Sequence, residues 1–156
     1  MSSDMDSAVR RIEQQVALLL RLADRNRRRS PRLERTLDRS AYLALRQLAD
    51  GGPAGINEIA DHLRLDASTV TRQVVAMEQA GYVSRGRDDS DGRRVVIEMT
   101  DAGRAELAAT ADARAEVYGD VLAEWSDPDL DLLAELLGRL NDSLEAHTRA
   151  VDARTA

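Results

Sequence analysis

The chain has 156 residues, 43% of them hydrophobic, and it contains no cysteine. This length supports one ordinary hydrophobic core, and the lack of cysteine excludes disulfides, thiolate metal sites and regulation through an oxidised thiol. No apolar run approaches the roughly 20 residues of a membrane span and no signal-peptide pattern precedes the first helix, so we expect a cytoplasmic protein without a membrane partner.

The formal net charge of −6 is distributed unevenly. Residues 21–46 hold nine arginines against three acidic residues, whereas residues 95–156 hold five arginines against fourteen acidic residues. A local cationic surface can therefore face phosphates although the whole chain is acidic. The charge pattern permits a nucleic-acid partner.

Two helices are predicted before the central segment. An apolar seam at spacings of three and four predicts a helix over about residues 6–28, formed by Val9, Ile12, Val16, Leu19 and Ala23. Ser30-Pro31 ends it, because the residue before proline avoids the helical region. A shorter helix is predicted over about residues 40–50 and closes at Gly51-Gly52-Pro53.

Residues 58–100 predict a helix-turn-helix followed by a hairpin of two strands. Asn57 is expected to cap the first helix and Asp66 the second. Wheel geometry turns Val70, Val74 and Met77 to the core, and leaves an outer face that carries Ser68, Thr69, Thr71, Arg72 and Val75. Such a face fits the major groove of DNA, where an arginine pairs with guanine, hydroxyls reach phosphates or base edges, and valine meets a thymine methyl. A solvated helix face has the same polar pattern and is the alternative.

The hairpin is expected to form a cationic wing. Gly81 ends the second helix, and strands at residues 83–87 and 95–99 are joined by residues 88–92. The arginines around the turn are Arg85, Arg87, Arg93 and Arg94. We expect Arg93 to enter the minor groove, with Asp88 or Asp91 supporting the wing by holding its guanidinium. A solvated charged turn is the alternative.

The last sixty residues predict two further helices separated at Asp127-Pro128. Their apolar stripes are Ala108, Ala111, Ala115, Tyr118, Leu122 and Trp125, then Leu130, Leu133, Leu137, Leu140, Leu144, His147 and Val151. These long helices exceed what a winged domain of about 70 residues needs for cover, so we favour an interface between two chains over packing within one subunit. The expected fold is mainly α with a small β-wing: one subunit over residues 1–156, a winged helix-turn-helix DNA-binding region at 40–100, and dimerisation helices at 1–30 and 101–151.

Several short motifs resemble the MarR (multiple antibiotic resistance regulator) family. They are Asn57-Glu58-Ile59-Ala60, Ser68-Thr69-Val70-Thr71-Arg72, Gly81-Tyr82-Val83, Asp88-x-x-Asp91-x-Arg93 and Met99-Thr100-x-x-Gly103. The resemblance covers nearly the whole chain. It implies a homodimeric winged-helix transcriptional regulator, expected to be a repressor, that binds an inverted-repeat operator in double-stranded DNA and is released by a small aromatic or phenolic effector. On this resemblance the effector would lie near Tyr42, Arg46 and His62, although core packing or a surface ion pair also accounts for such residues.

Other function classes receive little support from the sequence. A hydrolase would use Asp88, Asp89 and Asp91 as metal ligands, but no histidine or glutamate completes a coordination shell there. His62 and His147 are far apart in sequence, so neither a metal site nor a cofactor is expected. An enzyme is therefore not expected, and the remaining alternative is a protein-only dimerisation module.

Overall fold

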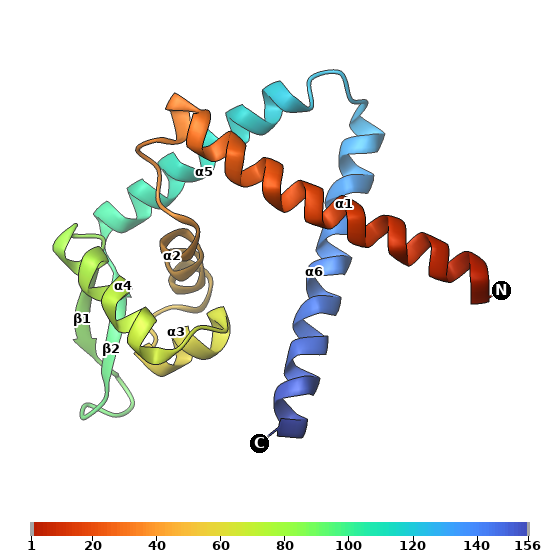
Figure 1. Cartoon of the computed structure of the whole chain (residues 1–156). Helices are drawn as coiled ribbons and strands as arrows, with labels where there is room; N and C mark the ends of the chain where they lie inside the picture. The colour runs from red at the N-terminus through yellow and green to blue at the C-terminus, as the bar shows by residue number, and fades with distance from the viewer. Residues whose placement is uncertain (1, 156) are drawn as a thin grey trace. The chain divides into compact units, whose positions relative to one another are not determined.

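The computed structural model describes residues 2–155, with side chains described for residues 4–154. The chain divides into two compact units, Met1–Ala115 and Glu116–Ala156. The first unit contains helices α1 (Ser2–Arg29), α2 (Arg39–Gly51), α3 (Ile56–Leu63) and α4 (Ala67–Gln79), a short 3-10 helix η1 (Pro31–Leu33), strands β1 (Val83–Arg87) and β2 (Val95–Met99), and the start of α5 (Asp101–Val121), as Figure 1 shows. The second unit contains the end of α5 and helix α6 (Asp127–Thr155). The fold is mainly α with a two-stranded wing, as the sequence predicts.

The end of α1 follows from proline chemistry. Helix α1 stops at Arg29, and Pro31 is the first residue of η1 after an extended Ser30 with ψ 114°. Three arginines occupy the last turn of α1, where cations interact favourably with the negative end of the helix dipole. The structure therefore confirms the prediction that this helix ends at Ser30-Pro31.

The core of the first unit lies between α2, α3, α4 and the wing. Leu45, Ile59 and Val74 are completely buried, and Ile97 of β2 is 1% exposed. Helix α2 contacts α3, α4 and β2, while α4 contacts α3 and β1. This packing of three helices against a hairpin places α4 and the wing in the same compact unit (Figure 1).

Two side chains of α5 form hydrogen bonds with the backbone of Leu37, just before the start of α2. The amide of Leu37 donates to the hydroxyl of Thr110, which is 1% exposed, at 3.2 Å. The carbonyl of Leu37 accepts a hydrogen bond from the Arg114 guanidinium at 2.9 Å. The Leu37 carbonyl also accepts a hydrogen bond from the Arg27 guanidinium at 3.4 Å, so both backbone groups of this buried residue have partners just before α2 begins.

The helix-turn-helix differs from its prediction at the start of α3. Gly55, rather than Asn57, is the residue at the N-cap, and its amide donates to the Glu58 carboxylate at 2.8 Å. The expectation that Asn57 caps this helix is therefore wrong, because Glu58 reaches back three residues and satisfies the first amide. The turn to α4 passes through Arg64, which adopts the left-handed conformation with φ 54°.

The first of the two C-terminal helices ends before the predicted apolar stripe does. Helix α5 ends at Val121, so Leu122 and Trp125 lie in the connection and not in the helix. Helix α6 begins at Asp127, where the break was predicted. Among the described helices, none is long and apolar enough to cross a membrane.

Candidate nucleic-acid interface

Helix α4 begins at a carboxylate cap, as the sequence predicts. Asp66 accepts a hydrogen bond from the amide of Thr69 at 2.8 Å, and the hydroxyls of Ser68 and Thr69 donate to the same carboxylate. These hydrogen bonds, first those from the two hydroxyls and then that from the amide, hold the pKa of Asp66 far below its ordinary value of 3.8. The cap stays ionised at neutral pH and fixes the first turn of α4.

The outer face of α4 is open to solvent and polar. Val70, Val74 and Met77 are at most 3% exposed and face the core. The opposite residues Ser68, Thr71, Arg72 and Val75 are exposed, and Thr69 is half-buried. The inner and outer faces of α4 are those that the wheel geometry predicts.

Local bonds already engage the hydroxyl hydrogens on this face. The Thr71 hydroxyl donates to the carbonyl of Ala67 at 2.7 Å, while Ser68 and Thr69 donate to Asp66. Among the described residues, the Arg72 guanidinium makes one hydrogen bond, to the Thr69 hydroxyl, at 3.3 Å. A guanidinium has five N–H donors, so Arg72 keeps most of its donors for a ligand. On this face, Arg72 is therefore the main source of hydrogen-bond donors for an external acceptor.

One hydrogen bond between α4 and the residue before α2 was not predicted from the sequence. The amide of Gln73 donates to the Asp38 carboxylate at 3.2 Å, and the same oxygen caps α2 through the amide of Ala41 at 2.8 Å. Asp38 before a helix is a recognisable cap signal, but its second partner lies 35 residues away. This contact couples the start of α2 to the middle of α4.

Asp88 organises the tip of the wing. One carboxylate oxygen accepts from the Ser90 amide at 2.8 Å, the Ser90 hydroxyl at 2.6 Å and the Asp91 amide at 3.2 Å. These bonds lower the pKa of Asp88, with the Ser90 hydroxyl as the largest cause. Asp91 accepts from the backbone amide of Arg93 at 3.1 Å. Both aspartates therefore support the turn, through its backbone.

Three of the four wing arginines have partners within the chain. Arg85 pairs with Glu78 of α4 at 3.2 Å, and the Arg87 guanidinium donates to the carbonyl of Arg93 at 3.3 Å. Arg94 pairs with Glu58 at 2.5 Å and with Asp88 at 3.5 Å. Hydrogen bonding to Glu58 raises the pKa of Arg94, and Arg94 is the largest cause of the lowered pKa of Glu58.

Arg93 differs from the other three. Within residues 4–154, its guanidinium makes no hydrogen bond or ion pair, and the side chain is exposed. The expectation that Asp88 or Asp91 holds the Arg93 guanidinium is therefore wrong, because Asp88 is engaged with Ser90 and Arg94 and Asp91 with the Arg93 amide. Among the described residues, the tip of the wing therefore presents one cation without a partner, Arg93.

The three residues expected near an effector are only partly brought together. Arg46 and His62 line a groove of about 590 Å³, together with Leu43, Gln47, Asp50, Gly51 and Leu63. Arg46 pairs with Asp50 at 3.5 Å, and the buried side-chain oxygen of Gln47 has no hydrogen-bond partner among the described residues. Tyr42 is not part of the lining; the guanidinium of Arg114 lies 4.3 Å from the centre of its ring.

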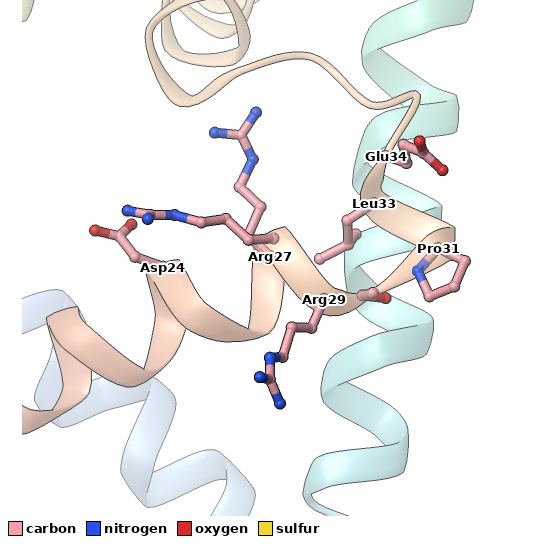
Figure 2. Close-up of a pocket in the computed structure, with 8 residues that line it drawn as sticks. Asp24, Arg27, Arg29, Pro31, Leu33 and Glu34 are labelled. Atoms are coloured by element: carbon pink, nitrogen blue, oxygen red, sulfur yellow. The ribbon is translucent and has the colours of Figure 1, made fainter.

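Two further hollows border the end of α1. A groove of about 670 Å³ is lined by Arg27 of α1, by Asp38 and Arg39, and by Thr69, Arg72 and Gln73 of α4. A neighbouring hollow of about 510 Å³ is formed by Asp24, Arg27 and Arg29 of α1 with Pro31, Leu33 and Glu34 of the following turn, as Figure 2 shows. In the part of the chain that the structure describes, no group of three or more histidine, cysteine, aspartate or glutamate residues is placed to bind a metal ion.

The polar face of α4 beside a hairpin with a free arginine defines a winged helix-turn-helix, a DNA-binding class. The MarR family model matches residues 37–95. The uncharacterized HTH-type transcriptional regulator YxaD of Bacillus subtilis is 42% identical over 105 residues, which cover 67% of this chain and 73% of YxaD. The chain therefore belongs to the MarR family and is a DNA-binding transcriptional regulator.

Solved structures share the fold over most of the chain. A MarR family protein from Bacillus stearothermophilus superposes with a TM-score of 0.69 at 22% identity, covering 93% of this chain and 99% of that one. FabT of Streptococcus pneumoniae, solved in complex with DNA, superposes with a TM-score of 0.65 at 17% identity, covering 87% of this chain and 96% of FabT.

Proposed function

We propose that the chain is a homodimeric repressor that binds an inverted-repeat operator through α4 and the wing. The observation that carries the proposal is the free guanidinium of Arg93 at the tip of an otherwise internally bonded hairpin. It stands in the same compact unit as the exposed donors of Arg72. FabT, which shares the fold, was solved bound to DNA, and this supports the same partner here. A DNA partner supports the expected cytoplasmic location.

Exposed apolar side chains support a dimer. On α1, Val9 is 56% exposed, Ile12 53% and Leu19 50%, although they follow one another at helical spacing. On α6, Leu137, Leu144 and Val151 are also exposed. Single exposed apolar residues need no explanation, but a continuous apolar stripe marks an interaction surface. A second copy of this chain is the proposed occupant.

A two-fold dimer presents two copies of α4 to one duplex. Half-sites about one helical turn apart, roughly 34–36 Å, would then read as an inverted repeat. Affinity would fall with salt because each arginine that neutralises a phosphate releases counterions. Arg72 is assigned to a guanine edge in the major groove, and Arg93 to the narrow minor groove.

The assignment is tested with duplexes selected from a random library by the full-length protein. We expect Arg72→Ala to lose about 1–3 kcal/mol of discrimination for each bidentate contact, so that selected and scrambled duplexes bind more alike. Arg93→Ala should weaken binding to both duplexes by a similar factor. Arg104→Ala is the matched control, because Arg104 is an exposed arginine paired with Asp101 at the start of α5.

Three results would contradict the proposal. Equal losses on both duplexes for Arg72→Ala would remove the base-reading role. A selection that yields no inverted repeat would remove the two-fold operator. A dimeric wild-type protein without salt-dependent affinity for any duplex would favour a protein-only dimerisation module.

The groove at Arg46 and His62 is the proposed effector site. The unpartnered oxygen of Gln47 needs a donor, and a phenolic hydroxyl supplies one. Leu43 and Leu63 give the groove apolar walls for an aromatic ring. The test is release of bound duplex by a panel of phenols. His62→Ala and Gln47→Leu should reduce release without changing affinity for DNA, and unchanged release in both variants would reject this site.

A further inference from the structure

The wing is attached at two points to the stretch of chain that runs from Ala54 into the first turn of α3. The inner attachment is a pair of backbone hydrogen bonds between Ala54 and Ile97, at 3.1 and 2.8 Å. Ala54 is 9% exposed and Ile97 1% exposed, so this attachment lies in the core. It fixes the middle of β2 and leaves the tip of the hairpin beyond it.

The outer attachment is an ionic cluster of Arg94, Glu58 and Asp88, here called the latch. The Arg94 guanidinium contacts Glu58 at 2.5 Å and Asp88 at 3.5 Å, and the Arg94 side chain is 42% exposed. It crosses Gly55 so closely that a Cβ at that position would lie 3.2 Å from it. Glu58 also accepts the Gly55 amide, so the latch ends on the first turn of α3.

The latch continues into the turn that carries Arg93. Asp88 uses one oxygen for Arg94 and the other for the Ser90 and Asp91 amides. The backbone of Arg94 closes the same turn, because its amide donates to the carbonyl of Asp91 at 2.9 Å and its carbonyl accepts from the Asp88 amide at 3.0 Å. An unbroken series of bonds therefore runs from α3 to the residue next to Arg93.

We propose that Arg94 is a positioning residue whose latch with Glu58 and Asp88 fixes the direction in which Arg93 leaves the wing. Two carboxylates surround one guanidinium, so the cluster has a net negative charge and does not attract phosphate. Sequence reasoning grouped Arg94 with the DNA contacts, and the latch gives it a different role. This inference rests on the proposed DNA-binding role of Arg93.

The charge of Glu58 separates the two roles of Arg94 experimentally. If Arg94 bound phosphate, Glu58→Gln would free it and remove a nearby negative charge, so affinity for DNA would rise. If the latch positions Arg93, Glu58→Gln breaks the ion pair and affinity falls. Glutamine at this position still accepts the Gly55 amide, so α3 keeps its cap.

The experiment measures the affinity of full-length protein for a library-selected duplex. Glu58→Gln and Arg94→Gln are compared with wild type, alone and combined with Arg93→Ala. We expect Glu58→Gln to weaken binding about threefold to tenfold, since one exposed ion pair contributes little and a dimer holds two latches. In the Arg93→Ala background the same change should have no effect, because nothing remains to be positioned. Asp101→Asn, which breaks an exposed pair with Arg104, is the matched control.

Amide hydrogen exchange gives a readout that does not need DNA. Glu58→Gln should speed exchange at residues 88–94 while the Ile97 amide stays protected by Ala54. Tighter DNA binding by Glu58→Gln, an equal loss in the Arg93→Ala background, or unchanged exchange at the tip would each overturn the latch. Failure of wild-type protein to bind any duplex would instead overturn the proposed function, and the exchange data would still decide whether the latch orders the tip.

Discussion

Gly103 at the start of α5 offers a sharp test of how the wing is joined to the next helix. A Cβ at this position would overlap the carbonyl oxygen of Tyr82 and lie 3.0 Å from Cγ of Met99. That carbonyl has little freedom to move, because it accepts the Thr100 amide at 3.0 Å. The Thr100 hydroxyl donates to the neighbouring carbonyl of Gly81 at 2.6 Å. Gly103→Ala must therefore displace backbone.

The expected cost follows from that overlap. Inserting a methyl group into a packed site costs about 1–3 kcal/mol of unfolding free energy. For a chain of this size such a loss lowers Tm by about 2–12 °C. Gly119→Ala is the matched control, because Gly119 lies within α5 with nothing within 4 Å of a Cβ. There the same change should stabilise by about 0.5–1 kcal/mol, since glycine is a poor helix former.

Thermal unfolding followed by circular dichroism measures both variants under one set of conditions. The reasoning requires opposite signs: Gly103→Ala below wild type and Gly119→Ala at or above it. A Tm for Gly103→Ala equal to that of wild type would refute the claim that the Tyr82 carbonyl is fixed. A similar loss in both variants would show that helix α5 responds to any added methyl group and not to this contact.

Two further predictions concern the cap of α4 and the proposed dimer. The pKa of Asp66 is depressed on folding, so its stabilisation is present above its ordinary pKa of 3.8 and is lost as pH falls through the lower folded-state value. Asp66→Ala should therefore unfold more readily than wild type in urea at pH 7, and the difference should shrink below pH of about 4; a constant difference would contradict the role of the carboxylate. Ile12→Glu should convert a dimer to a monomer in analytical ultracentrifugation and weaken operator binding by at least about tenfold, because the second half-site contact is lost. Gln14→Glu adds the same charge on the other side of α1, and equal dissociation by both variants would reject the stripe as the interface.

Helix α4 was predictable because its determinants are local. The core positions Val70, Val74 and Met77 recur at helical spacing, so one pattern defines both the helix and its inward face. Asp66 and Gly81 mark its limits through chemistry that acts within three or four residues, and Gly81 has the left-handed φ of 79° that favours glycine. The side chains on its exposed face followed directly from the same pattern.

The side-chain pairs behind the site were not predictable from periodicity. Gln73 forms a hydrogen bond with Asp38, which lies 35 residues earlier in the sequence. Arg94 forms an ion pair with Glu58, which lies 36 residues earlier. Such pairs depend on the way α2, α3 and the wing pack, and no local pattern encodes that packing. The error at Asn57 has the same origin: a local cap preference lost to Glu58, which the packed wing holds in place through Arg94.

The distinction matters most for the arginines, because charge alone assigns all of them to DNA. Arg85, Arg87 and Arg94 are each committed to a partner within the chain, and a phosphate would have to compete with Glu78, a backbone carbonyl or the latch. Arg93 has no such partner among the described residues, so an anion that bound its guanidinium would displace only water. In this arginine-rich hairpin, three arginines form bonds within the chain, and Arg93 is exposed at the tip. Among the described residues, the internal bonding of this hairpin engages Arg85, Arg87 and Arg94 and leaves the guanidinium of Arg93 free at the tip.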